Sequence, residues 1–149
     1  MTPVGHLAWG IKSSFLSYLE SLPDCTVSTL DGAWRDATTG QFHFPLEQRV
    51  DLSDGGVRLE FRGDVRIQAH GGMLLLILMS PWLSIGTDRT EFSVVDLMHW
   101  PDTSHREIMG VSGTTSGPEF PLTLAESAVE TFNSVYRAGE VLDPVILGP

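Results

Sequence analysis

A chain of 149 residues is long enough for one domain with a sizeable hydrophobic core. Its 19 acidic and 9 basic side chains give a net charge of −10, which disfavours nucleic-acid binding and adhesion to anionic lipid, because both need a basic surface. A single cysteine, Cys25, excludes an internal disulfide and a cysteine-ligated metal cluster. We therefore expect one domain over residues 1–149 that binds neither nucleic acid nor membrane.

The N-terminal residues carry no pattern typical of a targeting signal. Met1 to Glu20 alternates polar and apolar side chains, whereas a secretory signal needs a basic start followed by an apolar run. The longest apolar run, Met73–Met79, is far shorter than the roughly 20 residues that a membrane-spanning helix needs. We interpret the chain as given as cytoplasmic; a secreted or cell-surface location would follow if a leader had been removed.

The first predicted element is a short amphipathic helix. Apolar residues recur there at helical spacing, at Ile11, Phe15, Tyr18, Leu19 and Leu22. Pro23 ends the pattern because proline cannot continue a helix. Ser14 and Tyr18 are four residues apart and therefore share one face of this helix.

Short β-rich runs follow, separated by turns rich in glycine and aspartate, which is typical of an antiparallel sandwich or barrel. The predicted strands are Thr26–Leu30, Gln41–Phe44, Val57–Phe61, Val65–His70, Met73–Met79 and Glu91–Val95. Gly71 and Gly72 predict a tight hairpin turn, since glycine readily adopts positive φ. Met73–Met79, being wholly apolar, is expected to be buried on both faces. His43 alternates with two phenylalanines, so we expect it to be exposed.

The C-terminal third predicts a loop and a second helix. Glycine, serine, threonine and proline are frequent between Arg106 and Pro121, which indicates a loop. Thr123 with Glu126 three residues later forms a capping-box pattern. Leu124, Ala128, Val129 and Phe132 would give the helix an apolar face. The expected fold is therefore mainly β, an antiparallel sandwich or barrel-like domain with two short α-helices, and an α+β fold is the alternative.

Four blocks stand out in order along the chain: Trp9–Tyr18, Phe42–Pro45, Phe61–Leu74 and Phe132–Pro144. The first reads Trp-Gly-Ile-Lys-Ser-Ser-Phe-Leu-Ser-Tyr, and the second Phe-His-Phe-Pro. The third joins Phe-Arg-Gly-Asp-Val to Ala-His-Gly-Gly-Met-Leu, and the fourth contains Tyr-Arg-Ala-Gly and Leu-Asp-Pro. Together they resemble the HtaA-type domain of bacterial haem-uptake proteins, over nearly the whole chain.

This resemblance implies a cofactor and a set of site residues. It implies that Tyr18 ligates the iron of ferric haem b, that His70 supports this ligand, and that Ser14 lies near the haem propionates. Tyr136 is expected beside the pocket, and Gly71 would let the macrocycle approach the backbone closely. The resemblance is needed for this assignment, because Tyr18 and His70 lie far apart in the sequence and no spacing brings them together.

The chemistry of Tyr18 is compatible with that role. A tyrosine can be an axial ligand of haem iron. The ordinary pKa of a phenol is about 10, so ionisation at neutral pH needs help. Ferric iron favours the phenolate, and a hydrogen bond donated by His70 would favour it further. We therefore predict reversible binding of ferric haem, for transfer, storage or buffering, in an apolar slot between the first helix and the Val65–Met79 hairpin.

The expected partners are haem and another haem carrier or an importer component, and a homodimer is left open. Two other function classes are also left open: a haem-free module that binds a protein or glycan, and an enzyme built on the same pocket. The enzyme class is less favoured, since the chain has no nucleophile elbow, phosphate loop or dinucleotide fingerprint. His99 and His105 are not spaced as metal ligands and lack a third ligand.

Overall fold

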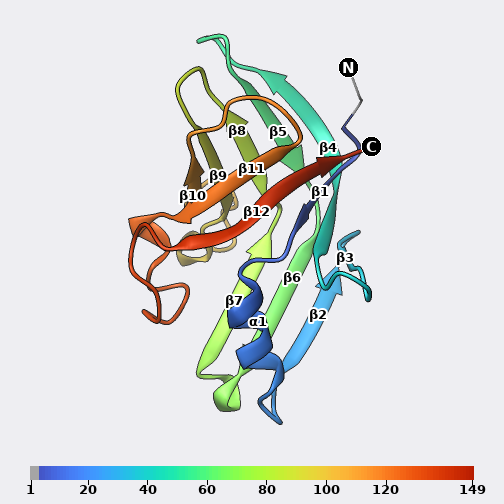
Figure 1. Ribbon diagram of the computed structural model, residues 1–149, viewed down its shortest axis with the longest axis vertical. Helices are drawn as coiled ribbons and strands as arrows, with labels where there is room; N and C mark the ends of the chain where they lie inside the picture. Colours follow the sequence, from blue (N-terminus) through green and yellow to red (C-terminus); the bar gives the residue numbers. More distant parts are fainter. Residues whose placement is uncertain (1–3) are drawn as a thin grey trace.

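The computed structural model describes residues 4–149, and its main body is a closed antiparallel barrel (Figure 1). The barrel closes because β1 (His6–Trp9) pairs with β12 (Val141–Gly148) on one side and with β4 (Phe42–Asp51) on the other. The other five strands of this eight-stranded ring follow β12 in the order β11 (Glu119–Leu124), β10 (Arg106–Ser112), β9 (Thr90–Val95), β8 (Trp82–Ile85) and β5 (Val57–Phe61). The fold is mainly β, as expected, and it is a barrel rather than a sandwich.

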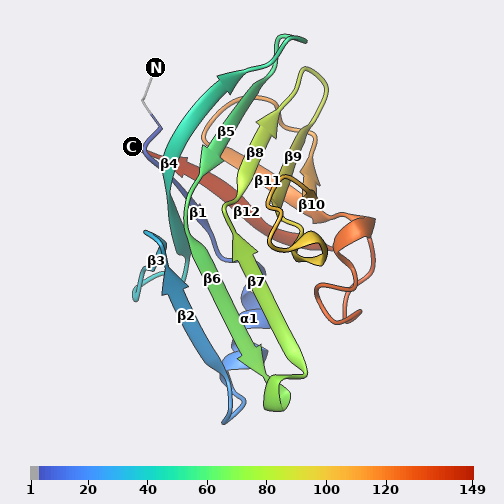
Figure 2. The ribbon, with the colours of Figure 1, turned by 180° about the vertical axis from the view of Figure 1, so that it is seen from behind.

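A smaller sheet extends from one end of the barrel. It consists of β2 (Thr26–Leu30), β6 (Asp64–Ala69) and β7 (Leu74–Met79) in the order β2-β6-β7. The short strand β3 (Trp34–Arg35) pairs with β4 beside it. Helix α1 (Ser13–Glu20) lies over one face of this sheet, and Figure 2 shows the opposite face. The sheet and α1 together form the lower half of the molecule in both views.

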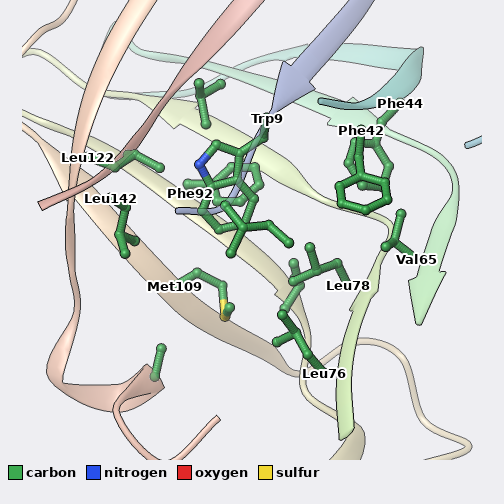
Figure 3. Close-up of a cluster of buried hydrophobic side chains, with 14 of the residues drawn as sticks. Trp9, Phe42, Phe44, Val65, Leu76, Leu78, Phe92, Met109, Leu122 and Leu142 are labelled. Atoms are coloured by element: carbon green, nitrogen blue, oxygen red, sulfur yellow. The ribbon is translucent and has the colours of Figure 1, made fainter. Parts of the chain in front are cut away.

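One core runs through the barrel and under α1. Its largest fully buried side chains are mostly aromatic, and they include Trp9, Phe42, Phe44, Phe61, Phe92, Phe120 and Phe132. Figure 3 shows Trp9 and Phe92 close together within the barrel, with ring centroids 4.8 Å apart. Leu76 and Leu78 of β7 reach the same core. Phe15, Leu16 and Leu19 of α1 belong to it as well.

Several predicted strands are confirmed. Those at Thr26–Leu30 and Val57–Phe61 have the predicted bounds. The strand predicted at Gln41–Phe44 continues to Asp51, where it pairs with β5. The first helix is also confirmed, over Ser13–Glu20.

The predictions for the C-terminal third are wrong. The expected loop between Arg106 and Pro121 contains β10 and the start of β11. The expected second helix is absent from the described chain, where Glu126–Ala128 forms only a short 3₁₀ turn. Leu122 and Leu124 alternate into the core while β11 pairs with β10 and β12, so barrel pairing overrides the capping pattern. The pairing register shifts between Ile108 and Gly110 and between Phe120 and Leu122, so the ladder is irregular at Met109 and at Pro121.

Three expectations about individual residues are also corrected. The strand predicted at Met73–Met79 is buried on one face only, since Leu75 is 48% exposed and Met73, just before β7, is 88% exposed. The hairpin loop is longer than two residues, because Ala69 pairs with Leu74 and leaves His70 to Met73 as the loop. His43 is buried instead of exposed: β3 lays the Trp34 ring over it, with ring centroids 4.0 Å apart.

Candidate functional site

The first residues of β12 hold the N-terminus of helix α1 in place. The Ser13 backbone N–H donates a hydrogen bond of 3.2 Å to Oδ1 of Asp143. The Lys12 ammonium donates to the Val141 carbonyl at 2.8 Å. A distant carboxylate thus provides the N-terminal cap that Lys12, the residue before the helix, cannot provide. These contacts fix the start of the helix that carries Ser14 and Tyr18.

The loop between β6 and β7 positions His70. The backbone has positive φ at His70, Gly71 and Gly72, with values of 55°, 66° and 90°. Positive φ costs little at glycine but is unfavourable at histidine, so His70 needs outside support. Asp24 gives such support to the loop, because its Oδ2 accepts a hydrogen bond of 2.6 Å from the Gly71 N–H.

Asp24 also links the loop electrostatically to the end of α1. The hydrogen bond from Gly71 lowers the pKa of the Asp24 carboxyl below its usual value, and the nearby His70 ring lowers it further. The carboxylate form is therefore the one that holds the hairpin tip. Asp24 lies in the turn that follows α1, so this contact joins the two elements that carry Tyr18 and His70.

Tyr18 and His70 meet at this junction. The Tyr18 hydroxyl and Nε2 of His70 form a hydrogen bond of 3.1 Å, with ring centroids 6.1 Å apart and planes tilted by 44°. Tyr18 is 50% exposed and His70 is also exposed. A neutral imidazole can accept from the phenol at Nε2 or donate from it, depending on the tautomer. The phenolic oxygen is thus close to an imidazole nitrogen and reachable from solvent.

The other predicted site residues lie on the same side of the molecule or at the hairpin tip. Ser14 is exposed on α1, one turn before Tyr18. Tyr136 packs against the same helix, with its ring centroid 5.7 Å from that of Phe15 and 5.4 Å from the Lys12 ammonium. Gly71 faces open space, because a Cβ built there meets no atom within 4 Å. The structure brings Tyr18 and His70 into contact and sets Ser14 and Tyr136 on or against α1.

The prediction of an apolar slot between α1 and the hairpin is wrong, because side chains fill that space. Phe15, Leu16 and Leu19 fill the space between the helix and the sheet, in one cluster with buried residues of β6 and β7. The Tyr18–His70 pair therefore lies at an open surface. Two apolar side chains next to site residues are exposed: Met73, which is in the same loop as His70, and Val135, which precedes Tyr136.

Sequence reasoning missed Asp24 and gave Lys12 no role. Asp24 follows a proline in a short turn and resembles any turn aspartate, so only its contact with Gly71 distinguishes it. Lys12 precedes the helix, and its approach to Tyr136 depends on a fold-back of the chain that spacing does not reveal. Either residue could be identified only from the tertiary structure, in which the hairpin tip meets the turn after α1 and the C-terminal segment meets the start of the helix.

Within residues 4–149, no group of three or more histidine, cysteine, aspartate or glutamate side chains is arranged to hold a metal ion. In the same part of the chain, each helix is too short or too polar to cross a membrane.

Comparison with known proteins gives matches over nearly the whole chain. The family model HtaA, described as Htaa, matches residues 4–147. The N-terminal domain of HtaA from Corynebacterium glutamicum has a similar structure, with a TM-score of 0.76, 19% identity, and coverage of 99% of this chain and 97% of that chain. The C-terminal domain of the same Corynebacterium glutamicum protein gives a TM-score of 0.74 and 21% identity, with 97% of this chain and 98% of that chain covered.

A third solved structure is also similar. The heme binding protein HtaB from Corynebacterium glutamicum gives a TM-score of 0.64 at 16% identity, with 97% of this chain and 91% of that chain covered. No curated protein matches the sequence. These likenesses to solved structures support the barrel fold with its single helix described above.

Proposed function

The chain belongs to the HtaA family, and we propose that it binds ferric haem b reversibly, with the Tyr18 phenolate as the axial ligand of the iron. His70 donates a hydrogen bond to that ligand. The observation that carries the proposal is the 3.1 Å contact between the Tyr18 hydroxyl and Nε2 of His70 at an exposed surface. The structural likeness to HtaB, a haem-binding protein, is consistent with it.

The residues present fit a ferric haem by the chemistry of their donor atoms. When bound, the haem supplies a ferric iron that acts as a Lewis acid and prefers a hard anionic oxygen ligand. The phenolic oxygen of Tyr18 is such a ligand, and its exposure leaves it accessible. The open space at Gly71 and the exposed Met73 side chain leave room and apolar surface beside it.

Each protein group has a distinct task in this proposal. His70, as the tautomer that carries its proton at Nε2, donates to the phenolate oxygen and stabilises its charged form. Asp24 holds the loop that carries His70 by accepting from the Gly71 N–H. Ser14, one turn before Tyr18, offers a hydroxyl to a propionate. The Tyr136 ring, packed on Phe15, borders the site on the helix flank.

The exposure of the site favours exchange over permanent retention. Tyr18 lies at an open surface, so a second protein could reach the bound ligand without unfolding of the barrel. A phenolate favours the ferric state, which suits release to another carrier better than oxygen chemistry. We therefore propose transfer, storage or buffering of haem, with a haem carrier or importer component as the partner and residues 1–149 acting as one domain.

Titration of the purified protein with hemin, followed by visible absorption, tests this function. We expect saturable one-to-one binding by the wild type, and a changed spectrum with much weaker affinity for Tyr18→Phe. Ser17→Ala is the matched control, because Ser17 is exposed on the same helix and makes no side-chain contact in the proposed site. An unchanged affinity and spectrum for Tyr18→Phe would reject the ligand. No spectral change with excess hemin in the wild type would favour the haem-free module instead.

A further inference from the structure

Strand β7 leaves one backbone edge without a partner. It pairs with β6 along its whole length, from Leu74 opposite Ala69 to Met79 opposite Asp64, and it is the last strand of its sheet within residues 4–149. An unpaired edge offers a row of N–H and C=O groups to another strand, and proteins usually protect such edges with charged residues, proline or a bulge. The side chains of β7 read Leu-Leu-Leu-Ile-Leu-Met and supply no charge or proline. β9 approaches part of β7 without pairing with it, and the remaining edge, beside Leu75 and Ile77, is open to strand addition.

A groove of about 380 Å³ lies beside β7. Leu75 and Ile77 of β7 form one wall, and Val95, Leu97 and Met98 form apolar parts of the other. The second wall is formed by the end of β9, the connection between β9 and β10, which Figure 2 shows next to the upper part of β7, the start of β10 and the segment after β11. Leu75 is 48% exposed and Met98 is 89% exposed, so apolar surface is available on both walls. Leu75 and Ile77 alternate with the buried side chains of β7 and thus lie on the sheet face opposite α1.

The groove is also acidic. Asp96, Glu107 and Glu130 line it, and the described residues that line it include no lysine or arginine. Burial raises the pKa of Glu107, and the nearby Asp96 charge raises it further, although a hydrogen bond from Thr131 acts in the opposite direction. A positive charge placed beside these carboxylates would relieve their mutual repulsion. Charge complementarity therefore favours a basic occupant.

We propose that this groove and the free edge of β7 bind an extended segment of a partner protein in which apolar residues alternate with lysine or arginine. The segment adds as a strand to β7, since backbone hydrogen bonds to the edge provide affinity that does not depend on sequence. Because side chains alternate along a strand, its apolar residues contact Leu75 and Ile77 while its basic residues lie on the other face, within reach of the carboxylates. A second copy of this chain is disfavoured, because it would bring two sets of carboxylates together.

This inference is independent of haem binding, and a synthetic peptide tests it. The probe is a ten-residue peptide of alternating valine and arginine with both ends blocked, and its acidic counterpart has glutamate in place of arginine. Isothermal titration calorimetry is expected to show saturable binding of the basic peptide only. Glu107→Gln combined with Glu130→Gln should weaken that binding about 3-fold to 10-fold, the effect of two partly exposed ion pairs. The matched control, Glu47→Gln with Glu119→Gln, removes the same charge at exposed sites outside the groove and should leave the affinity unchanged.

A second peptide separates strand addition from simple charge attraction. It keeps the valine and arginine side chains but carries methyl groups on alternate backbone nitrogens, which removes the donors needed for pairing. Loss of binding by this peptide supports strand addition to β7. Equal binding by the methylated peptide, equal weakening by the two double variants, or no saturable binding of the basic peptide would each overturn the proposal. Concentration-dependent dimerisation abolished by Leu75→Lys would overturn it in favour of a second copy as the occupant.

Discussion

The hydroxyl of Tyr18 and Nε2 of His70 lie 3.1 Å apart although 52 positions separate them in the sequence. Helix α1 supplies the phenol and the β6–β7 loop supplies the imidazole. Packing of Phe15, Leu16 and Leu19 against the small sheet holds α1 in place, and Asp24 fastens the loop to the segment after the helix. The contact is therefore a product of tertiary packing, and it can be disturbed from several directions.

Removing the imidazole should weaken haem binding less than removing the phenol. His70→Ala deletes the proposed donor to the ligand oxygen, and loss of a group that hydrogen-bonds a metal ligand typically costs about 10-fold to 100-fold in affinity. His70→Gln keeps an N–H donor and should retain more affinity than His70→Ala. Hemin titration of the three proteins checks the order. A larger loss for His70→Ala than for Tyr18→Phe would identify the histidine as the ligand instead.

Asp24 should act on the site through the hairpin tip. In Asp24→Asn the charged acceptor of the Gly71 N–H is lost, so we expect faster hydrogen exchange at the Gly71 amide and weaker haem binding, with α1 and the barrel intact. Amide exchange measured by NMR gives a readout that does not depend on haem. Asp31→Asn is the control, since Asp31 is exposed in another turn and has positive φ of its own. Unchanged exchange at Gly71 would contradict the role.

The lowered pKa of Asp24 predicts that the β6–β7 loop loses its order only in acid. The pKa of Asp24 is lowered in the folded protein, so the stabilisation is fully present above the ordinary carboxyl pKa and is lost as pH falls through the lower folded value. Exchange protection at Gly71 should thus hold at neutral pH and decline only in acid below about pH 4. A decline centred near neutral pH would assign the dependence to another group.

His43 should make the barrel less stable in mild acid. It is buried under Trp34, neither of its ring nitrogens has a hydrogen-bond partner among residues 4–149, and burial lowers its pKa, with a further contribution from His6. The unfolded chain therefore binds a proton more readily than the folded one, and stability falls as pH drops below about 6.5, the ordinary histidine pKa. The free energy of unfolding, measured in urea at several pH values between about 7.5 and 5, tests this dependence, because the range spans the ordinary histidine pKa. His43→Phe should retain stability at pH 7 and reduce the dependence; an unchanged slope would refute the assignment.

Phe15 should couple the site to the stability of the fold. Its ring is buried and packs edge-on against Phe132 and Tyr136, with centroids 5.4 Å and 5.7 Å away. Phe15→Ala removes a large core side chain, which typically costs about 3–5 kcal/mol of unfolding free energy. Ser17→Ala, on the exposed face of the same helix, should change it by less than about 0.5 kcal/mol. Equal stabilities in urea unfolding would mean that α1 is not part of the core.

The strands with clear local patterns could be predicted from the sequence, and those set by long-range pairing could not. In Val57–Phe61 apolar and charged residues alternate, turns that contain glycine lie on both sides, and the strand has its predicted bounds. β1 and β12 have no such pattern: β1 has four residues and β12 contains Pro144, yet their pairing closes the barrel. The first residues of β11 fall in the predicted loop, and its last two were predicted to begin a helix, because Thr123 and Glu126 fit a capping box when the neighbouring strands are not considered.

The features of the candidate site that depend on local spacing could likewise be predicted from the sequence, and those that depend on long-range contacts could not. The helical spacing of Ser14 and Tyr18 is local, and the structure agrees with it. The approach of His70 to Tyr18 followed only from the resemblance, since no local pattern relates a helix to a hairpin tip so far along the chain. The predicted slot failed because apolar residues that could line a pocket can equally fill it, and here Phe15, Leu16 and Leu19 do. Binary patterning identifies which face is buried but not whether a cavity remains.

The central claim is that the oxygen of Tyr18 bonds to the iron of bound haem. Resonance Raman spectroscopy of the protein mixed with hemin, excited within the phenolate-to-iron charge-transfer band, tests it most directly. We expect phenolate vibrations enhanced in the wild type and in Ser17→Ala, and absent in Tyr18→Phe. Enhancement that persists in Tyr18→Phe, or its absence from a wild-type complex that binds haem tightly, would contradict the claim.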